Sequence, residues 1–217
     1  MYRICQYAIN KAQNGYLTSS EFNLLVNQAQ TSYQDYLMGE FQQYQYGRPQ
    51  ARVSYSQNEN IRQRITPLII KQDLDIDVNG IANYPEYYLQ VDAMWTSDGL
   101  RRVRFVPQDS LYSYYNSQID PIETNPIYTL QYGSFQFYPI TLDAAVISYI
   151  ITAPAIYWGF TLDVNNRQQY DFGTSIQPVW YDVDLLEIIA RTLKLVGVSL
   201  QIGQVEQYAN QVTQQGQ

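Results

Sequence analysis

The chain has 217 residues and a formal net charge of −7, and this acidic balance argues against general nucleic-acid binding, which needs a basic face. Because it contains no histidine, Ser-His and Cys-His catalytic pairs and histidine metal sites cannot form within it. Its single cysteine, Cys5, likewise excludes an intrachain disulfide and a four-cysteine zinc site.

The first part of the chain carries helical patterns. Residues 1–11 place apolar side chains at helical spacing and predict a short helix. Thr18 and Glu21 have the spacing of a capping box, in which the two side chains satisfy backbone N–H groups at a helix start. From Phe22 onward, apolar side chains recur every three or four residues, which predicts one long helix of about seven turns ending near Gly47.

Beyond Pro67 the period of the apolar residues changes from 3.6 to 2, which predicts β-strands. The expected strands are 68–78, 87–95, 100–106, 127–131, 134–138 and 144–152, with turns at Asn79-Gly80, Ser97-Asp98-Gly99 and Tyr132-Gly133. Short helices are predicted at 59–64 and 108–117. We therefore expect a block of antiparallel strands between two helical regions.

The end of the chain returns to a helical period. Residues 159–178 form a polar stretch, and about 20 irregular residues are typical of a binding loop or an arm. A helix is predicted over 183–197, where Asp182 and Asp184 suit the positive end of its dipole. A last short amphipathic piece covers 202–212.

This order of elements predicts an α+β fold with two domains. We expect a helical body, made of residues 1–65 and 156–217, that contains a long N-terminal helix and C-terminal helices. We expect residues 66–155 to form an antiparallel β domain inserted into that body, because both ends of the β block return to one helical unit.

Three aspartates alternate with apolar residues on the first predicted strand. Asp73, Asp75 and Asp77 are expected to share one face of the strand at intervals of roughly 6.5 to 7 Å. A hydrolase with paired carboxylates could use such distances. A solvated or partner-facing strand surface gives the same pattern, and we prefer that interpretation.

Three arginines follow the second predicted hairpin turn. Arg101, Arg102 and Arg104 could contact phosphate. An ion pair with the Asp73–Asp77 face, within the subunit or across to a neighbour, explains the same residues. Cys5 has no histidine to activate it and is expected to be a small core residue.

The sequence contains no glycine-rich phosphate loop, nucleophile elbow or kinase signature. We therefore expect no catalytic residue, no cofactor, no metal site and no enzymatic activity. The chain has 22 tyrosines and 27 glutamines but only three lysines. These uncharged side chains make hydrogen bonds, and tyrosine adds apolar area, so such a surface suits contact with other proteins.

Several stretches carry a resemblance to a known family. They are Asn14 to Asn23 opening the long helix, Asn125-Pro126-Ile127-Tyr128, Tyr138-Pro139, Ser148-Tyr149-Ile150 running to Ala153-Pro154, and the closing helix from Trp180 through Val196-Gly197. In this order and spacing, the chain resembles the head-to-tail adaptor, or connector ring, proteins of tailed bacteriophages. It is most similar to the portal-associated ring proteins of crAss-like, podovirus-type phages.

The resemblance implies a helical body with an inserted β domain and twelve copies arranged in a ring. The ring would be stacked on the portal protein or on other ring or tail proteins, and genomic DNA would pass through its lumen without sequence-specific binding. We therefore expect a structural virion protein of the head–tail junction, assembled in the host cytoplasm. No membrane contact is expected, because no apolar run reaches the ~20 residues of a membrane span.

The residues expected at subunit interfaces are Arg101, Arg102, Arg104, Asp73, Asp75, Asp77 and Trp180, together with the 159–178 loop and the C-terminal helix. Two alternatives to the ring stay open. One is a tail-associated cell-wall hydrolase that uses Asp73, Asp75 or Asp77. The other is a glycan-binding tail module, because tyrosine and tryptophan rings can stack on sugars.

Overall fold

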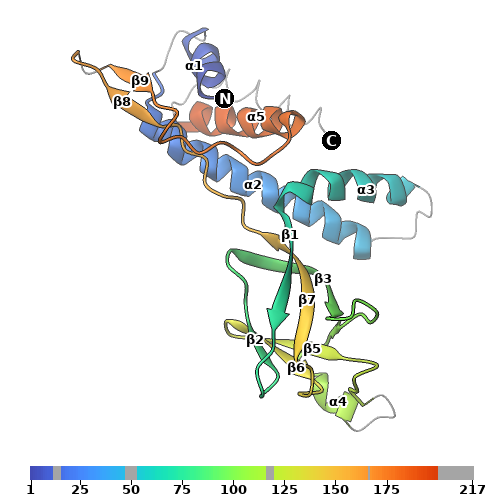
Figure 1. Ribbon diagram of the computed structural model, residues 1–217. Helices are drawn as coiled ribbons and strands as arrows, with labels where there is room; N and C mark the ends of the chain where they lie inside the picture. Colours follow the sequence, from blue (N-terminus) through green and yellow to red (C-terminus); the bar gives the residue numbers. More distant parts are fainter. Residues whose placement is uncertain (12–15, 47–52, 116–119, 166, 200–217) are drawn as a thin grey trace. The chain divides into compact units, whose positions relative to one another are not determined.

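The computed structural model describes residues 1–11, 16–46, 53–115, 120–165 and 167–199 (Figure 1). The chain divides into two compact units. Met1–Pro67 and Ala153–Gln217 form the first, which we call the helical unit, and Leu68–Thr152 form the second, which we call the β unit. In sequence, the β unit is therefore an insertion between the two parts of the helical unit.

The α+β class is confirmed by the elements of the two units. The helical unit contains α1 (Tyr2–Lys11), α2 (Ser19–Tyr46), α3 (Val53–Ile65), α5 (Asp182–Ser199) and the strands β8 (Phe160–Leu162) and β9 (Gln168–Tyr170). The β unit contains β1 (Ile69–Asp75), β2 (Ile81–Asn83), β3 (Tyr88–Thr96), β4 (Arg104–Phe105), α4 (Leu111–Tyr115), β5 (Ile127–Gln131), β6 (Ser134–Tyr138) and β7 (Ala144–Ile151). A single 3-10 turn, Thr66–Leu68, precedes β1.

The helix at the N-terminus is short, so the long helix of the body is not N-terminal. As residues 1–11 and the capping box predict, α1 has 10 residues and the helix of 28 residues is the second one, α2. The capping box starts this new helix: Thr18 N donates to Glu21 Oε2 at 2.9 Å and Glu21 N donates to Thr18 Oγ1 at 3.2 Å. The Glu21 carboxylate also accepts from Thr18 Oγ1 at 2.7 Å, and the bonds that it accepts from Thr18 N and Oγ1 lower its pKa.

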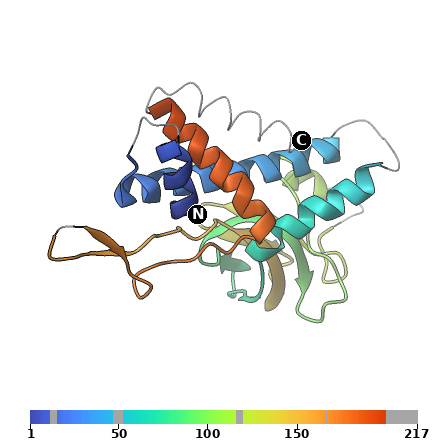
Figure 2. The same ribbon diagram turned by 90° about the horizontal axis from the view of Figure 1, so that it is seen from above.

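The core of the helical unit forms where α2 and α5 lie side by side (Figures 1 and 2). The apolar face of α2 is fully buried, and its members recur every three or four residues: Phe22, Val26, Ala29, Tyr33 and Leu37. The facing residues of α5 that are buried include Ile188, Ile189, Leu193 and Val196. The period in the sequence therefore identifies the buried face of α2, whereas in α5 the first apolar residues of the period, Val183 and Leu186, are exposed.

The β unit contains two sheets. β1, β7 and β3 form an antiparallel sheet in the order β1-β7-β3, and the second sheet has the order β2-β6-β5-β4. Aromatic rings join the sheets: the Tyr88 ring on β3 meets the Phe135 ring on β6 edge to face, with centroids 5.4 Å apart. Phe135 and Phe137 are fully buried beneath the second sheet.

One pairing corrects the expectation of a wholly antiparallel domain. β4 is only two residues long and runs parallel to β5. After the turn that follows β3, the chain returns along this strand as far as Val103, whose N donates to Met94 O at 2.9 Å. It then moves to the other sheet, where Arg104 N donates to Pro126 O at 3.1 Å. The predicted strand 100–106 is therefore divided between two sheets, which a period of two cannot reveal.

Other elements differ from the expectation in length. The first predicted strand ends at Asp75 rather than Val78, and Val78 is exposed. The helix predicted at 59–64 is the longer α3. Most of its residues are polar, so only the buried Ile61 and Ile65 show the helical spacing. The loop predicted at 159–178 contains the β8–β9 hairpin, β2 was not predicted, and the piece predicted at 202–212 lies outside the described residues.

Cys5 is expected to be unreactive in the native protein. Its side chain on α1 is fully buried, and burial raises the pKa of the thiol to about 12. Because the thiolate is the nucleophile, an aromatic disulfide reagent at about pH 8 should modify no thiol before unfolding and one thiol in guanidinium chloride. Rapid modification of one thiol in the native protein would contradict the buried position.

Candidate functional site

Amide side chains on one face of α2 hold residues 153–158, which we call the strap, against the helix. Asn27 Nδ2 donates to Ile156 O at 2.8 Å, and Asn27 Oδ1 accepts from Ile156 N at 2.8 Å. Asn23 binds both backbone groups of Trp158 in the same way, at 3.2 and 2.8 Å. Each of these amides gives the strap the pair of hydrogen bonds that a neighbouring β-strand would give.

Two glutamines continue the same row toward the start of the strap. Gln30 Nε2 donates to Pro154 O at 2.9 Å, and Gln34 Oε1 accepts from Ala153 N at 3.1 Å. Positions 23, 27, 30 and 34 follow the helical period, so the four amides share one face of α2. None of them was predicted as functional, although the recurrence of Asn and Gln at this spacing is a signal in the sequence.

After the strap, the chain passes through Gly159 into the β8–β9 hairpin, which we call the arm. Gly159 N donates to Ser175 Oγ at 2.9 Å, and Asp171 N donates to Gly159 O at 2.9 Å. The backbones of Tyr157 and Ile176 also exchange two hydrogen bonds, at 3.1 and 2.8 Å. These bonds fix the base of the arm, whose two strands project from the helices of the unit (Figure 2).

Aromatic rings gather where the strap, the arm and α1 meet. The Tyr2 ring lies 4.3 Å from the Trp158 ring and 5.0 Å from the Phe22 ring, measured between centroids. The Tyr170 ring on β9 lies 5.5 Å from that of Trp158. These contacts tie α1 and α2 to the arm and form the wall of a depression.

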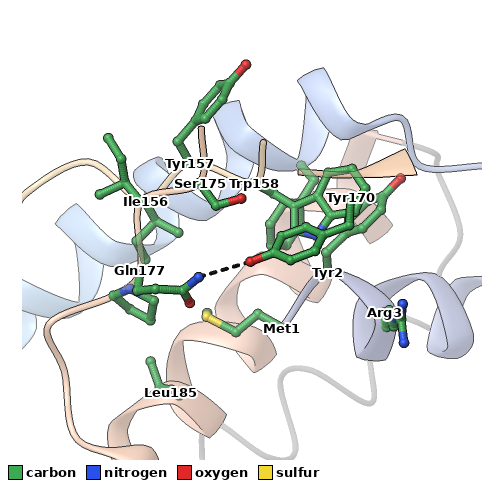
Figure 3. A pocket seen from close by; sticks show the side chains of 13 residues that line it. Met1, Tyr2, Arg3, Ile156, Tyr157, Trp158, Tyr170, Ser175, Gln177 and Leu185 are labelled. Atoms are coloured by element: carbon green, nitrogen blue, oxygen red, sulfur yellow. Dashed lines mark hydrogen bonds between the residues drawn. The ribbon is translucent and has the colours of Figure 1, made fainter. Parts of the chain in front are cut away.

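A pocket of about 470 Å³ opens beside this wall (Figure 3). Its lining includes Tyr2, Arg3, Trp158, Tyr170 and Gln177, and Gln177 Nε2 donates to Tyr170 Oη at 3.2 Å. An adjoining pocket of about 890 Å³ shares the first four of these residues and adds Gln6, Tyr16, Thr18, Arg167, Gln168 and Gln169. We call the two together the arm-base pockets; both volumes lie in the range of ligand sites.

The charge of the arm-base pockets is one-sided. Their linings contain Arg3 and Arg167 but no aspartate or glutamate, although the whole chain has a net charge of −7. Three carboxylates adjoin lining residues in the sequence, and each is engaged elsewhere. Glu21 belongs to the capping box, Asp184 accepts from Tyr33 Oη, and Asp171 accepts from Gly173 N and Thr174 Oγ1 at 2.9 Å in a turn. The pockets therefore offer cationic, amide and aromatic groups.

The structure places the predicted aspartates in two different settings. Asp73 and Asp75 are exposed on β1 on either side of the buried Leu74, as the alternation predicts. Asp77 lies beyond the strand, and its Oδ1 accepts from Ile81 N at 2.7 Å and from Asn79 N at 2.9 Å. These bonds lower the pKa of Asp77, and the bond from Ile81 N has the largest effect. The expected row of three carboxylates is thus a pair, because the third stabilises a turn.

The predicted arginines lie apart from these aspartates. Arg102 pairs with Trp95 at the outer side of β3, so β7 and β3 separate it from β1 by about 14 Å, three strand spacings. In the described part of the chain, the expected ion pair within the subunit is therefore not formed. Arg101 Nη1 donates to Glu123 O at 3.0 Å, and Arg102 and Arg104 line a cleft of about 590 Å³ that also contains Asp92.

Trp180 belongs to the core of the helical unit. It is 5% exposed, and its ring packs edge to face on Tyr33 with centroids 5.2 Å apart. Tyr33 Oη donates to the buried Asp184 Oδ1 at 2.6 Å, and Arg64 Nε lies 3.8 Å from the same oxygen. Burial, with Asp184 beside it, raises the pKa of Tyr33. The predicted interface residue thus anchors the start of α5 instead of lying on the surface.

Gly159→Ala is expected to destabilise the arm base by about 1–3 kcal/mol, the usual range for overpacking. An added Cβ would overlap Thr174 Oγ1 and lie 2.7 Å from Asp171 O, a backbone atom that cannot easily yield. The matched control is Gly39→Ala in α2, where nothing lies within 4 Å and the change should stabilise the helix by about 0.5–1 kcal/mol. Denaturant unfolding of both variants checks the pair. Equal stability of Gly159→Ala and the parent would contradict the close approach.

Known proteins and general site patterns give no further assignment. In the ranges that the structure describes, no group of three or more His, Cys, Asp or Glu side chains could hold a metal ion. Within the same ranges, no helix has the length and apolar character to cross a membrane. No protein-family model matches the chain, and no curated protein is significantly similar to it in sequence.

Proposed function

We propose that the chain is a structural subunit of the head-to-tail connector of a tailed bacteriophage. Copies of it, twelve by the family resemblance, would form a ring that joins the portal to the tail and lines the DNA channel. The helical body with an inserted domain agrees with the adaptor architecture that the resemblance implies. The proposal makes the protein a virion component that acts by shape and contact.

The arm is the observation that carries this proposal. It is a sheet of two strands, and each strand has an outer edge that no other described strand pairs. An isolated two-stranded hairpin is marginally stable in water. The arm and the turn after it also expose large apolar side chains, with Leu162 59%, Val164 100% and Phe172 76% exposed. A projecting hairpin with free edges and exposed apolar side chains suits burial against a neighbouring subunit.

The charge and composition of the chain give independent support. Heterologous interfaces on two sides and axial contacts above and below leave a ring subunit little surface for water. With only three lysines against 22 tyrosines, the chain suits such polar but buried contacts. A net charge of −7 also suits a channel through which DNA must slide, because like charges keep the duplex from adhering.

The described residues give the hydrolase alternative less support. The carboxylate of Asp77 is hydrogen-bonded within a turn, and neither Asp73 nor Asp75 lines any of the described pockets. A carboxylate pair outside a cleft has no means of excluding water or orienting a substrate. The glycan-binding alternative would use the aromatic residues of the arm-base pockets, and there the rings of Tyr2 and Trp158 cover one another.

Imaging tests the proposal directly. The protein is examined by electron microscopy alone and mixed with the portal protein of the same phage genome, and class averages with rotational symmetry are expected. Leu162→Asp should prevent these rings, because it places a charge on the arm surface that a neighbour would cover. Val78→Asp in the β unit, at a site 90% exposed, is the control. Single subunits in every mixture, or lysis of cell walls by the parent protein, would overturn the proposal.

A further inference from the structure

Among the described residues, no carboxylate lines the arm-base pockets or forms an ion pair with their two cations. Arg3 and Arg167 line the pockets, are exposed, and form no ion pair with any described residue. In a chain with net charge −7, an acid-free lining of this kind favours an anionic group from outside the subunit. The charge of the pockets therefore indicates an acidic partner.

The amides of the pockets indicate the form of that partner. Gln6, Gln168, Gln169 and Gln177 line them, and each amide can donate two hydrogen bonds and accept two. Gln177 and Gln6 each donate one bond, to Tyr170 Oη and Tyr2 Oη, and so retain capacity. On α2, amides of this chain already bind the extended backbone of the strap. An extended acidic peptide segment fits the same chemistry.

The chain itself exposes such a segment at the edge of a sheet. β1 pairs only with β7, so its other backbone edge is open in the described structure. Four successive residues, 70–73, are exposed, which means that neither face of this part of the strand is covered. Asp73 and Asp75 place two exposed carboxylates on one face of the strand.

We propose that the arm-base pockets of one copy bind the edge strand β1 of the next copy, with Asp73 and Asp75 facing Arg3 and Arg167. This inference rests on the proposed ring, because different surfaces of successive copies meet, and such a contact closes into a ring when the rotation allows. The β unit has a cationic cleft of its own, lined by Arg102 and Arg104, but this cleft also contains the carboxylate of Asp92 and therefore complements an acidic strand less well.

Edge strands also carry charges for a different purpose, since charged side chains at a free edge prevent pairing with other molecules. The experiment separates the two roles by exchanging charges between the faces. The pocket variant carries R3E and R167E, and the strand variant carries D73R and D75R. D109R with D120R, at two exposed aspartates in the segment between β4 and β5, is the control for added positive charge.

Under conditions in which the parent forms rings, each variant alone should associate at least about tenfold more weakly, because every contact then opposes like charges. Mixed in equal amounts, the two variants should form rings again, because an alternating ring pairs glutamate pockets with arginine strands and arginine pockets with aspartate strands. The quadruple variant should form rings by itself. Sedimentation velocity measures association, and circular dichroism verifies that each variant is folded.

Three results would overturn the inference and leave the proposed ring intact. In the first result, either variant forms rings as readily as the parent does. In the second, mixing fails to restore rings from folded variants. In the third result, R102E with R104E, rather than R3E with R167E, would rescue the strand variant and assign the acidic strand to the cleft of the β unit. If the parent forms no ring, even with the portal protein, both this inference and the proposed function are overturned.

Discussion

Asn27→Leu is expected to lower the free energy of unfolding of the helical unit by about 2–4 kcal/mol. The substitution keeps the size of the side chain but leaves the N–H and C=O of Ile156 without their partners. Ile156 is 4% exposed, so water cannot replace the lost bonds without opening the strap. Each unsatisfied buried group costs about 1–3 kcal/mol.

Two further variants make this test specific. Asn27→Asp keeps an acceptor for Ile156 N but sets a carboxylate against Ile156 O, so it should also destabilise the unit. Gln28→Leu makes the same kind of change at the adjacent exposed position and should shift stability by no more than about 0.5 kcal/mol.

Tryptophan fluorescence during denaturant unfolding provides the measurement, since Trp158 and Trp180 both belong to the helical unit. If Asn27→Leu and Gln28→Leu unfold at the same denaturant concentration, the amide row does not hold the strap.

Above about pH 10 the free energy of unfolding is expected to fall steeply. Burial raises the pKa of several acidic groups, among them Tyr88 to about 12 and Cys5 to about 12, as well as Tyr33 and Tyr128. Smaller increases with the same leading cause occur at Tyr2, Tyr84, Tyr115 and Tyr149. The folded protein therefore holds these protons more tightly than the unfolded chain does.

The sign follows from proton linkage. Below the ordinary pKa values, about 8.5 for cysteine and about 10 for tyrosine, both states are protonated and the stability is fully present, so the loss begins with Cys5 and steepens where the tyrosines titrate. As the pH rises past these values, the unfolded chain releases protons that the folded protein retains, and stability is lost. Each retained proton contributes at most about 1.4 kcal/mol per pH unit, and partly exposed tyrosines contribute less.

Guanidinium unfolding between about pH 9 and about pH 11.5, with tyrosinate absorbance recorded in parallel, measures this loss. Tyr128→Phe should make the dependence on pH less steep, because it removes one buried phenol and keeps the ring. Tyr132→Phe, at a fully exposed site in a turn, should leave the dependence unchanged. Stability that stays constant to about pH 11 would contradict the burial of these hydroxyl groups.

Sequence patterns located the elements whose signals are local. The strands β5 and β6 have the predicted ends, because alternating apolar residues flank a turn at Tyr132-Gly133 and Gly133 adopts a positive φ of 76° there. The helix α2 begins at its capping box and buries the face that the apolar period marks. Such features depend on residues within a few positions of one another, so the chain displays them directly.

The candidate site was largely invisible to the same reasoning. The strap and α2 are more than 100 positions apart in the chain, and only folding brings Asn27 to Ile156. Asn and Gln on a helix usually face water, so their period has no meaning until a backbone lies against them. The predicted interface residue Trp180 proved to be core, because a single tryptophan carries no local sign of its exposure.

Composition and short-range periodicity are enough to establish the α+β class, the lack of histidine chemistry, the acidic balance and most helices and strands. Three features emerge only on folding: β4 runs parallel to β5, Asp77 closes a turn while Asp73 and Asp75 remain exposed, and Arg3 and Arg167 line an acid-free depression. Strand pairing, burial and local charge depend on which distant segments of the chain meet. Bringing those segments together costs chain entropy, and only the packing of the whole unit offsets this cost.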